Sequence, residues 1–199
     1  MTVVGVRLVD GGFLLVADNS DLGRTILVAG QGGKSTLARA LAADLSLPCI
    51  ELDSIFWLVD WEQRSYEDFR VEVQAAIDGN PGGWVIDGNY ASALEGLVAK
   101  QAETVVYVNM PWRVMYWRIF WRSLRRSRTR EVLWNGNVEG RRDNLLSRES
   151  LLWTLLKRRK TFIGTRSERL REWAGDARFI ELDGRRALEE FYVERGLVR

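Results

Sequence analysis

The sequence predicts an α/β protein with three layers, in which helices cover both faces of a five-stranded parallel sheet. The first observation behind this prediction is that short apolar runs alternate along the chain with longer segments of helical period. The second is a cluster of glycines between the first of these runs and the helix after it. The third is an arginine-rich segment after the fourth run, which predicts a helical region outside the sheet.

Five short apolar segments have the length and residue types of buried strands. Because parallel strands are covered on both faces, their sequences are nearly continuous in apolar residues rather than alternating. The segments are "TILVA" (25–29), "CIELD" (49–53), "WVID" (84–87), "TVVYVNM" (104–110) and "RFIEL" (178–182).

Helical patterns separate these strands. A helix after the first strand has apolar residues at helical spacing through Leu45, and Pro48 ends it. Ser65 with Asp68 three residues later resembles a capping box and predicts a helix to about Ile77. Pro111 suits the first turn of a helix after the fourth strand. A short helix is expected near 94–100 and a last one over 186–194.

The length of 199 residues fits a single domain. Residues 1–24 are expected to form an N-terminal extension or a hairpin around residues 10–12, where Asp-Gly-Gly favours a turn. Residues 112–171 are expected to form a basic helical region after the fourth strand.

The composition excludes several kinds of chemistry. The chain has no histidine, which excludes Ser-His-Asp triads and zinc sites of the H-E-x-x-H type. Its single cysteine cannot form an internal disulfide. No apolar run is long enough to span a bilayer and the first residues lack the pattern of a signal peptide, so we expect a cytoplasmic protein without a membrane partner.

Charge is distributed unevenly along the chain. Residues 112–171 contain 17 Lys and Arg against 5 Asp and Glu, a net charge of +12, and the rest of the chain carries −10. About a third of the chain is therefore suited to bind anions, which could be small phosphates, nucleic acid or a membrane surface.

The segment "VAGQGGKSTL" has the order of a phosphate-binding P-loop, or Walker A motif, in which glycines precede Lys-Ser or Lys-Thr at the start of a helix. The motif normally has four residues between its glycines, and here only two lie between Gly30 and Gly33. An alignment without a gap would put Val28 at the first glycine and Gly23 in a buried strand. We therefore favour Gly30 as the first glycine, in a loop that is two residues short.

In such a loop, backbone N–H groups and the helix dipole bind phosphate, the lysine reaches the outer phosphates, and the hydroxyl ligates Mg²⁺. Lys34 is the expected phosphate-binding and catalytic lysine, and Ser35 the expected Mg²⁺ ligand. The alternative is a tight strand-to-helix turn that has no ligand. The expected nucleotide-binding residues are Gly30, Gln31, Gly32, Gly33, Lys34, Ser35 and Thr36.

Ligands of parallel sheets bind at the carboxyl ends of the strands. Asp53 is a candidate catalytic residue there, because one carboxylate orients the acceptor hydroxyl in phosphoryl transfer. Single aspartates at these positions can also cap turns, and aromatic residues near a cleft are as often packing as binding. The candidate acceptor-binding residues are Asp53, Trp57, Asp87, Asn89 and Tyr90.

Four arginines after the fourth strand lie on one face of the expected helix, at 118, 122, 125 and 126. This stripe fits a clamp on transferring phosphates, a nucleic-acid or membrane patch, or a solvated surface. We favour the clamp and take Arg122 and Arg126 as candidate catalytic residues.

Together, "VAGQGGKSTLARALA", "ELDSIFW", "WVIDGNY", "TVVYVNMPW" and "RTREVLWNGN" resemble the adenylate-kinase-related P-loop kinases that include the topology-modulation-protein group. The resemblance covers roughly residues 24–190. It implies a three-layer P-loop kinase core with a five-stranded parallel sheet, an arginine-rich helical lid, and ATP with Mg²⁺ as donor.

The resemblance also implies roles for single residues. Lys34 and Ser35 match the phosphate-binding lysine and the Mg²⁺ hydroxyl, and Asp53 matches an acidic residue that acts as base or Mg²⁺ partner in related kinases. Asp87 is similar to the aspartate that helps hold Mg²⁺ through water. Where adenylate kinases bind the AMP phosphate with an arginine, this chain has Ala91, so AMP is not the expected acceptor.

The sequence thus predicts an ATP-dependent phosphotransferase with a small-molecule or nucleotide acceptor. The alternative is a degenerate P-loop protein that binds nucleotide or nucleic acid without kinase activity. A GTPase is disfavoured because the N-K-x-D signature is missing.

Overall fold

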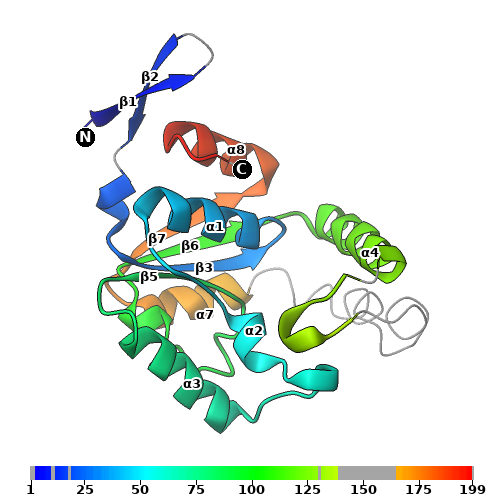
Figure 1. Cartoon of the computed structure of the whole chain (residues 1–199). Coiled ribbons are helices and arrows are strands. Elements are labelled where there is room, and N and C mark those ends of the chain that lie inside the picture. Colours follow the sequence, from blue (N-terminus) through cyan, green and yellow to red (C-terminus); the bar gives the residue numbers. More distant parts are fainter. Residues whose placement is uncertain (1–2, 10–11, 18, 130, 139–164, 199) are drawn as a thin grey trace.

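The computed structural model describes residues 3–9, 12–17, 19–129, 131–138 and 165–198 of the chain. Its centre is a parallel sheet of five strands in the order β4-β5-β3-β6-β7 (Figure 1). The strands are β3 (Thr25–Gln31), β4 (Cys49–Glu51), β5 (Trp84–Asp87), β6 (Thr104–Asn109) and β7 (Arg178–Asp183). The predicted sheet is therefore confirmed, and all five predicted strand segments take part in it.

Neighbouring strands end at different heights on the carboxyl side of the sheet. β3 pairs with β6 as far as Gln31, which lies opposite Asn109. On its other side β3 pairs with β5 only as far as Val28, opposite Asp87. The end of β3 therefore extends past β5, and this step lies beside the predicted phosphate loop.

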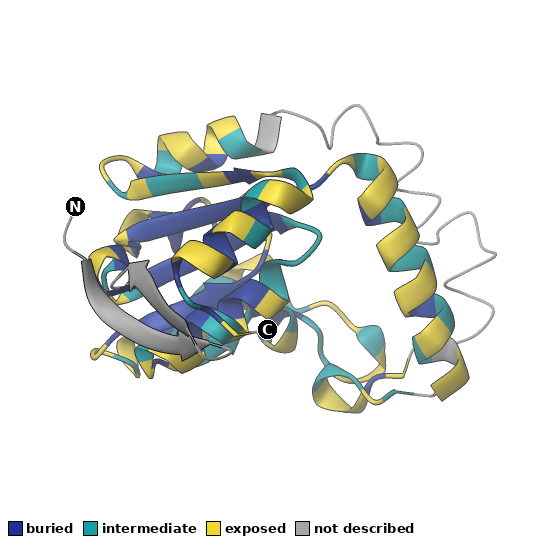
Figure 2. Cartoon of the chain, turned by 90° about the horizontal axis from the view of Figure 1, so that it is seen from above, coloured by how far each residue is buried: buried dark blue, intermediate teal, exposed yellow. Residues whose placement is uncertain are grey.

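Helices cover both faces of the sheet, which gives three layers (Figure 1). On one face, α1 (Lys34–Leu45) and α8 (Gly184–Glu194) pack over a core that includes Leu37, Val106 and Leu188. On the other face, α3 (Tyr66–Asp78) and α7 (Thr165–Ala174) contribute Phe69 and Leu170 to a core that includes Ile86 and Tyr107 of the sheet. Buried residues follow one another along the three central strands, β5, β3 and β6 (Figure 2).

The predicted helix boundaries are confirmed where local capping chemistry determines them. The Ser65 hydroxyl oxygen accepts a hydrogen bond of 3.0 Å from the Asp68 N–H, and α3 begins at the next residue after Ser65. At the end of α1, Ser46 takes a left-handed conformation with φ of 52°, two residues before Pro48.

Two sequence predictions of local structure were wrong. The strand expected over 49–53 ends at Glu51, because the chain turns into the short helix α2 (Leu52–Phe56). The helix expected near 94–100 is a series of turns followed by a 3₁₀ helix at Ala99–Gln101. Glu95 and Gly96 both have positive φ, 50° and 77°, which interrupts a right-handed helix.

The arginine-rich helix after the fourth strand is α4 (Trp112–Thr129), and it projects from the body of the protein (Figure 1). The lid region predicted for 112–171 lies outside the described residues over 139–164. Among the described helices, none combines the length and apolar character needed to cross a bilayer. The predicted N-terminal hairpin consists of β1 (Val3–Val9) and β2 (Gly12–Ala17), which pair antiparallel.

Candidate active site

A cleft with a volume of 890 Å³ lies at the carboxyl end of β3, between the start of α1, the turn after β5, α4 and α8. Seven cationic and three acidic side chains are among its lining residues, so the cleft favours anions. The cationic residues are Lys34, Arg39, Arg118, Arg122, Arg125, Arg126 and Arg185, and the acidic ones are Glu51, Asp53 and Glu189.

The glycine turn connects β3 to α1 with only Gly32 and Gly33 between the two elements. Val28 is fully buried within β3, so the first strand lies where the gapped alignment places it. Gly30, Gly32 and Gly33 have φ of 95°, 84° and 133°, which favours glycine at all three positions.

Gly30 has a second reason to be glycine. A Cβ atom at this residue would lie 2.1 Å from the carbonyl oxygen of Val108 in β6, a contact that backbone atoms cannot relieve. A Cβ atom at Gly32 would lie 2.6 Å from Cγ of Met110. The short turn is therefore packed tightly against the end of β6.

The start of α1 directs backbone donors into the cleft. The N–H of Leu37 donates to the carbonyl of Gly33 at 3.0 Å, so the amides of the three preceding residues have no acceptor within the helix. These residues, Lys34, Ser35 and Thr36, line the cleft together with the rest of the glycine turn. N–H groups and the positive end of the helix dipole make this end of α1 suited to bind a phosphate.

Lys34 and Asp87 form an ion pair at the bottom of this site. The ammonium Nζ of Lys34 lies 2.7 Å from Oδ1 of Asp87, and the Asp87 side chain is 4% exposed. The carboxylate holds the ammonium beside the start of α1. Asp87 is therefore close to the glycine turn, although it is not among the described residues that line the cleft.

Asp53 lies on the side of the cleft away from α8, in the first turn of α2. Its Oδ1 atom accepts a hydrogen bond of 2.6 Å from the Tyr90 hydroxyl. Burial, together with the charge of Asp53, raises the pKa of Tyr90 well above its ordinary value, so the phenol remains a donor. The ring of Tyr90 packs against Phe56 and Phe69, at centroid distances of 4.8 and 5.1 Å. This packing fixes the direction in which Asp53 faces.

Glu51 is a cleft residue that the sequence analysis missed. Its carboxylate accepts hydrogen bonds from the Arg39 guanidinium at 2.8 Å and from Nε1 of Trp134 at 2.9 Å. Burial alone would raise the pKa of Glu51, but the hydrogen bonds from Trp134 and Arg39 outweigh it and hold the pKa below its ordinary value. The signal for Glu51 was its position two residues before Asp53 at the end of the same predicted strand.

The "WNGN" turn brings Trp134 to Glu51. Asn135 donates a hydrogen bond of 3.1 Å to the carbonyl of Ser54, and Asn137 donates one of 2.7 Å to the carbonyl of Leu58. Asn135 has a positive φ of 56°, a conformation that asparagine tolerates better than most residues. Side-chain amides therefore attach the turn after α4 to the segment after β4.

Four arginines of α4 line the cleft, as the sequence predicted for this helix. Arg118 also contacts the glycine turn, because its Nη1 donates a hydrogen bond of 2.6 Å to the carbonyl of Gly32. Arg125 and Arg126 both face Glu131, at 3.5 and 3.7 Å. Arg122 and Arg126 are the catalytic candidates predicted from the sequence, and Arg118 is the arginine that the structure shows bonded to the turn.

The structure thus brings most predicted site residues to one cleft. Gly30 to Thr36, Asp53, Asn89, Tyr90, Arg122 and Arg126 all line it. Trp57 is not among the described lining residues, and its ring packs against Phe56 and Trp61. The side-chain amide of Asn89 bonds to the backbone of Gly30, so in this structure it faces the glycine turn. A role of either residue in acceptor binding stays a prediction.

The residues present fit a magnesium ion that is held mainly by phosphates. Within the described part of the chain, no group of three or more carboxylate, cysteine or histidine side chains could hold a metal alone. Mg²⁺ in kinases keeps several waters and takes only one or two protein ligands beside substrate phosphates. The hydroxyl of Ser35 and the nearby carboxylate of Asp87 are oxygen donors of the kind that Mg²⁺ prefers.

Comparison with known proteins supports the fold. The chain is similar to the solved structure of shikimate kinase from Acinetobacter baumannii in complex with shikimate, with a TM-score of 0.50 and 17% sequence identity. The match covers 85% of this chain and 92% of that chain. No family model and no curated protein matches the sequence. The chain therefore has the α/β fold of P-loop kinases, with a five-stranded parallel sheet and covering helices.

Proposed function

We propose that this protein is a phosphotransferase that uses ATP and Mg²⁺ to phosphorylate a small-molecule or nucleotide acceptor. The observation that carries the proposal is one cleft that combines two kinds of group. Lys34 at the start of α1 and the arginines of α4 line it, and so does the carboxylate of Asp53. Phosphoryl transfer needs this combination of positive charge around the phosphates and a group that orients the acceptor hydroxyl.

On the donor side, the amides at the start of α1 bind phosphate oxygens and Lys34 neutralises the outer phosphates. Asp87 keeps the Lys34 ammonium in place at 2.7 Å. Arg118, Arg122 and Arg126 face the same space and stabilise the charge on the transferring group. Ser35 and Asp87 would hold Mg²⁺, which would supply further charge neutralisation at the phosphates.

On the acceptor side, Asp53 accepts the hydrogen bond of the acceptor hydroxyl. The Tyr90 hydroxyl already occupies Oδ1 of Asp53, which leaves Oδ2 to face the substrate. The shared fold with a kinase solved in complex with shikimate also supports a small-molecule acceptor. The cytoplasm, as the compartment that supplies ATP, is the location we propose for this reaction.

The test is calorimetric titration of the protein with ATP and Mg²⁺. We expect binding at submillimolar to millimolar ATP and its loss in the Lys34→Ala variant. Lys100→Ala is the matched control, because Lys100 is exposed in the 3₁₀ helix before β6 and does not line the cleft. If the native protein binds no ATP at millimolar concentration, the proposal is wrong.

A second candidate function is nucleic-acid binding without phosphoryl transfer. It is favoured by the exposed outer face of α4, where Trp117 and Trp121 are 57% and 61% exposed beside several arginines. Aromatic and basic side chains together bind single strands by stacking and charge. Binding to duplex or single-stranded DNA that falls steeply with salt and does not change in Lys34→Ala would favour this candidate.

A further inference from the structure

Asn89 follows β5 in the turn Gly88–Tyr90, and its side chain makes two hydrogen bonds to a single residue of the glycine turn. The Gly30 N–H donates to Oδ1 of Asn89 at 2.7 Å. Nδ2 of Asn89 donates to the carbonyl of Gly30 at 2.6 Å. One amide side chain therefore satisfies both backbone polar groups of Gly30, as a neighbouring strand would.

The need for this contact follows from the sheet register. β5 ends at Asp87 opposite Val28, and the Gly88 N–H makes a further bond of 3.1 Å to the Val28 carbonyl. Beyond this point β3 continues along β6 alone, with Gly30 opposite Val108. Gly30 is buried, so its N–H and C=O would be costly to leave without partners. The side chain of Asn89 supplies the two hydrogen bonds that a residue of β5 would make here if the strand continued.

The contact also determines which amides remain for a phosphate. Because the Gly30 N–H donates to Asn89, this first glycine does not contribute a donor to the anion site. Two residues later, Arg118 holds the carbonyl of Gly32 at 2.6 Å. The turn is thus fixed by a side chain at each end, and the N–H groups left for a phosphate are those of Gly32, Gly33 and the start of α1.

We propose that Asn89 is the positioning residue of the phosphate site. Its side chain holds Gly30 in place where β5 has ended, and it shapes the turn to bind one phosphate group of the nucleotide at the start of α1. The inference rests on the proposed function for the identity of the ligand. Asn89 acts through Gly30 and does not itself contact the phosphate.

The test compares two variants of Asn89 with a matched control. Asn89→Ala removes both hydrogen bonds to Gly30. Asn89→Asp keeps an acceptor for the N–H but places a carboxylate against the Gly30 carbonyl. Asn109→Ala is the control, because Asn109 is the residue at the end of the adjacent strand β6 and its Nδ2 donates to Asp183 at 2.6 Å instead.

Calorimetry with ATP and Mg²⁺ is the first measurement. We expect affinity to fall about tenfold in Asn89→Ala, which corresponds to the loss of about one net hydrogen bond. The fall in Asn89→Asp should be at least as large, and Asn109→Ala should bind within twofold of the native protein. Thermal unfolding of each variant checks that it is folded. Equal affinity of Asn89→Ala and Asn109→Ala would overturn the inference.

Hydrogen exchange at the Gly30 amide is the second measurement, and it does not depend on ATP. We expect slow exchange in the native protein and in Asn109→Ala, and exchange at least tenfold faster in Asn89→Ala. If the native protein binds no ATP, the proposed function fails, and faster Gly30 exchange still supports the positioning role. Unchanged exchange in Asn89→Ala would show that Asn89 does not fix the turn.

Discussion

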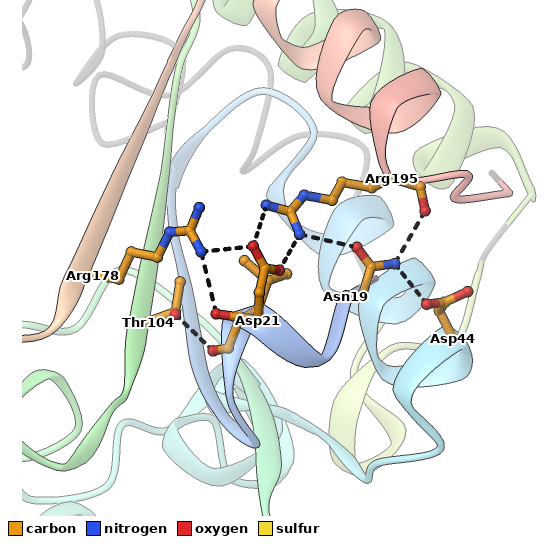
Figure 3. A network of polar contacts seen from close by, with 7 residues as sticks. Asn19, Asp21, Asp44, Thr104, Arg178 and Arg195 are labelled. Atoms are coloured by element: carbon orange, nitrogen blue, oxygen red, sulfur yellow. Dashed lines mark hydrogen bonds and ion pairs between the residues drawn. The ribbon is translucent and has the colours of Figure 1, made fainter. Parts of the chain in front are cut away.

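At the amino end of the sheet, Asp21 accepts hydrogen bonds from Arg195 and Arg178, and Asn19 donates to Asp44 at 2.6 Å (Figure 3). At the carboxyl end, seven cations line a cleft with three acids. The first set of charges is balanced within the protein. The second keeps an excess of positive charge even when the neighbouring Asp87 and Glu131 are counted, as expected of a site that binds anions.

The backbone N–H groups at the two ends of the sheet also differ in whether they have acceptors within the protein. At the amino end, the Glu103 carboxylate accepts the N–H groups of Arg24 and Thr25, at 2.5 and 2.9 Å, where β3 begins. At the carboxyl end, the first amides of α1 have no acceptor in the helix. Substitutions at the two ends should therefore separate loss of folding stability from loss of ligand binding.

The largest effect is expected for Gly30→Ala, which should disturb both properties. The new Cβ would lie 2.1 Å from the Val108 carbonyl oxygen, at a φ of 95°. We expect a loss of about 3 kcal/mol in the free energy of unfolding, measured by denaturant titration, and no measurable ATP binding. Gly82→Ala is the control, since a Cβ there meets no atom within 4 Å. A stable Gly30→Ala variant would contradict the packing described for the turn.

Arg118→Ala, at the carboxyl end, should lower activity without lowering folding stability. Loss of one donor that faces the phosphates is expected to lower the rate of phosphoryl transfer about 100-fold. The free energy of unfolding should change by about 0.5 kcal/mol or less, because the side chain is exposed. Steady-state kinetics and denaturant titration measure the two effects. The control is Arg113→Ala, an exposed arginine of α4 that does not line the cleft, and it should leave the rate unchanged.

Arg195→Ala should lower the free energy of unfolding and leave activity unchanged, the opposite of Arg118→Ala. Arg195 is buried, so its removal leaves Asp21 and Asn19 without a main partner. We expect a loss of about 2 kcal/mol in the free energy of unfolding and an unchanged rate of transfer. Arg186→Ala removes only an exposed pair with Glu190 and should leave the free energy of unfolding almost unchanged. If Arg195→Ala lowers activity without loss of stability, the division between the two ends is wrong.

The smallest effect is expected in the loss of folding stability at acid pH. The pKa of Asp21 lies below its ordinary value, because hydrogen bonds from Arg195 and Arg178 outweigh the opposing effect of burial. Backbone hydrogen bonds from Arg24 and Thr25 likewise lower the pKa of Glu103. A carboxyl whose pKa is lower in the folded state stabilises the fold above its unfolded pKa of about 4, and this stability is lost as the pH falls through the folded value.

Denaturant titrations from pH 7 to pH 3 measure this loss. We expect a smaller loss of stability with acid in Asp21→Asn than in the native protein, because the variant has one carboxyl fewer to protonate. The effect should be modest, since both carboxylates are partly exposed to solvent. An identical pH dependence in Asp21→Asn and the native protein would show that Asp21 does not stabilise the fold.

The sequence by itself determined the five strands of the parallel sheet and most of the helices that cover it. Continuous apolar runs, the capping Ser65 and the glycines before Lys34 all act within a few residues, so the sequence shows them directly. It also placed Lys34, Asp53 and the arginines of α4 at the same edge, because parallel strands direct their carboxyl ends to one side. The helix predicted near residues 94–100 was wrong, because Glu95 and Gly96 have positive φ, which the spacing of apolar residues does not reveal.

Only the tertiary structure decided how the site is held together. Asn89 and Gly30 are 59 residues apart, and Trp134 and Glu51 are 83 apart. No local pattern pairs such residues, because their contact depends on where each strand ends and how the chain returns. The sequence therefore specified a short glycine turn and the lysine after it, and the stepped ends of β3 and β5 left Gly30 to be bonded by Asn89.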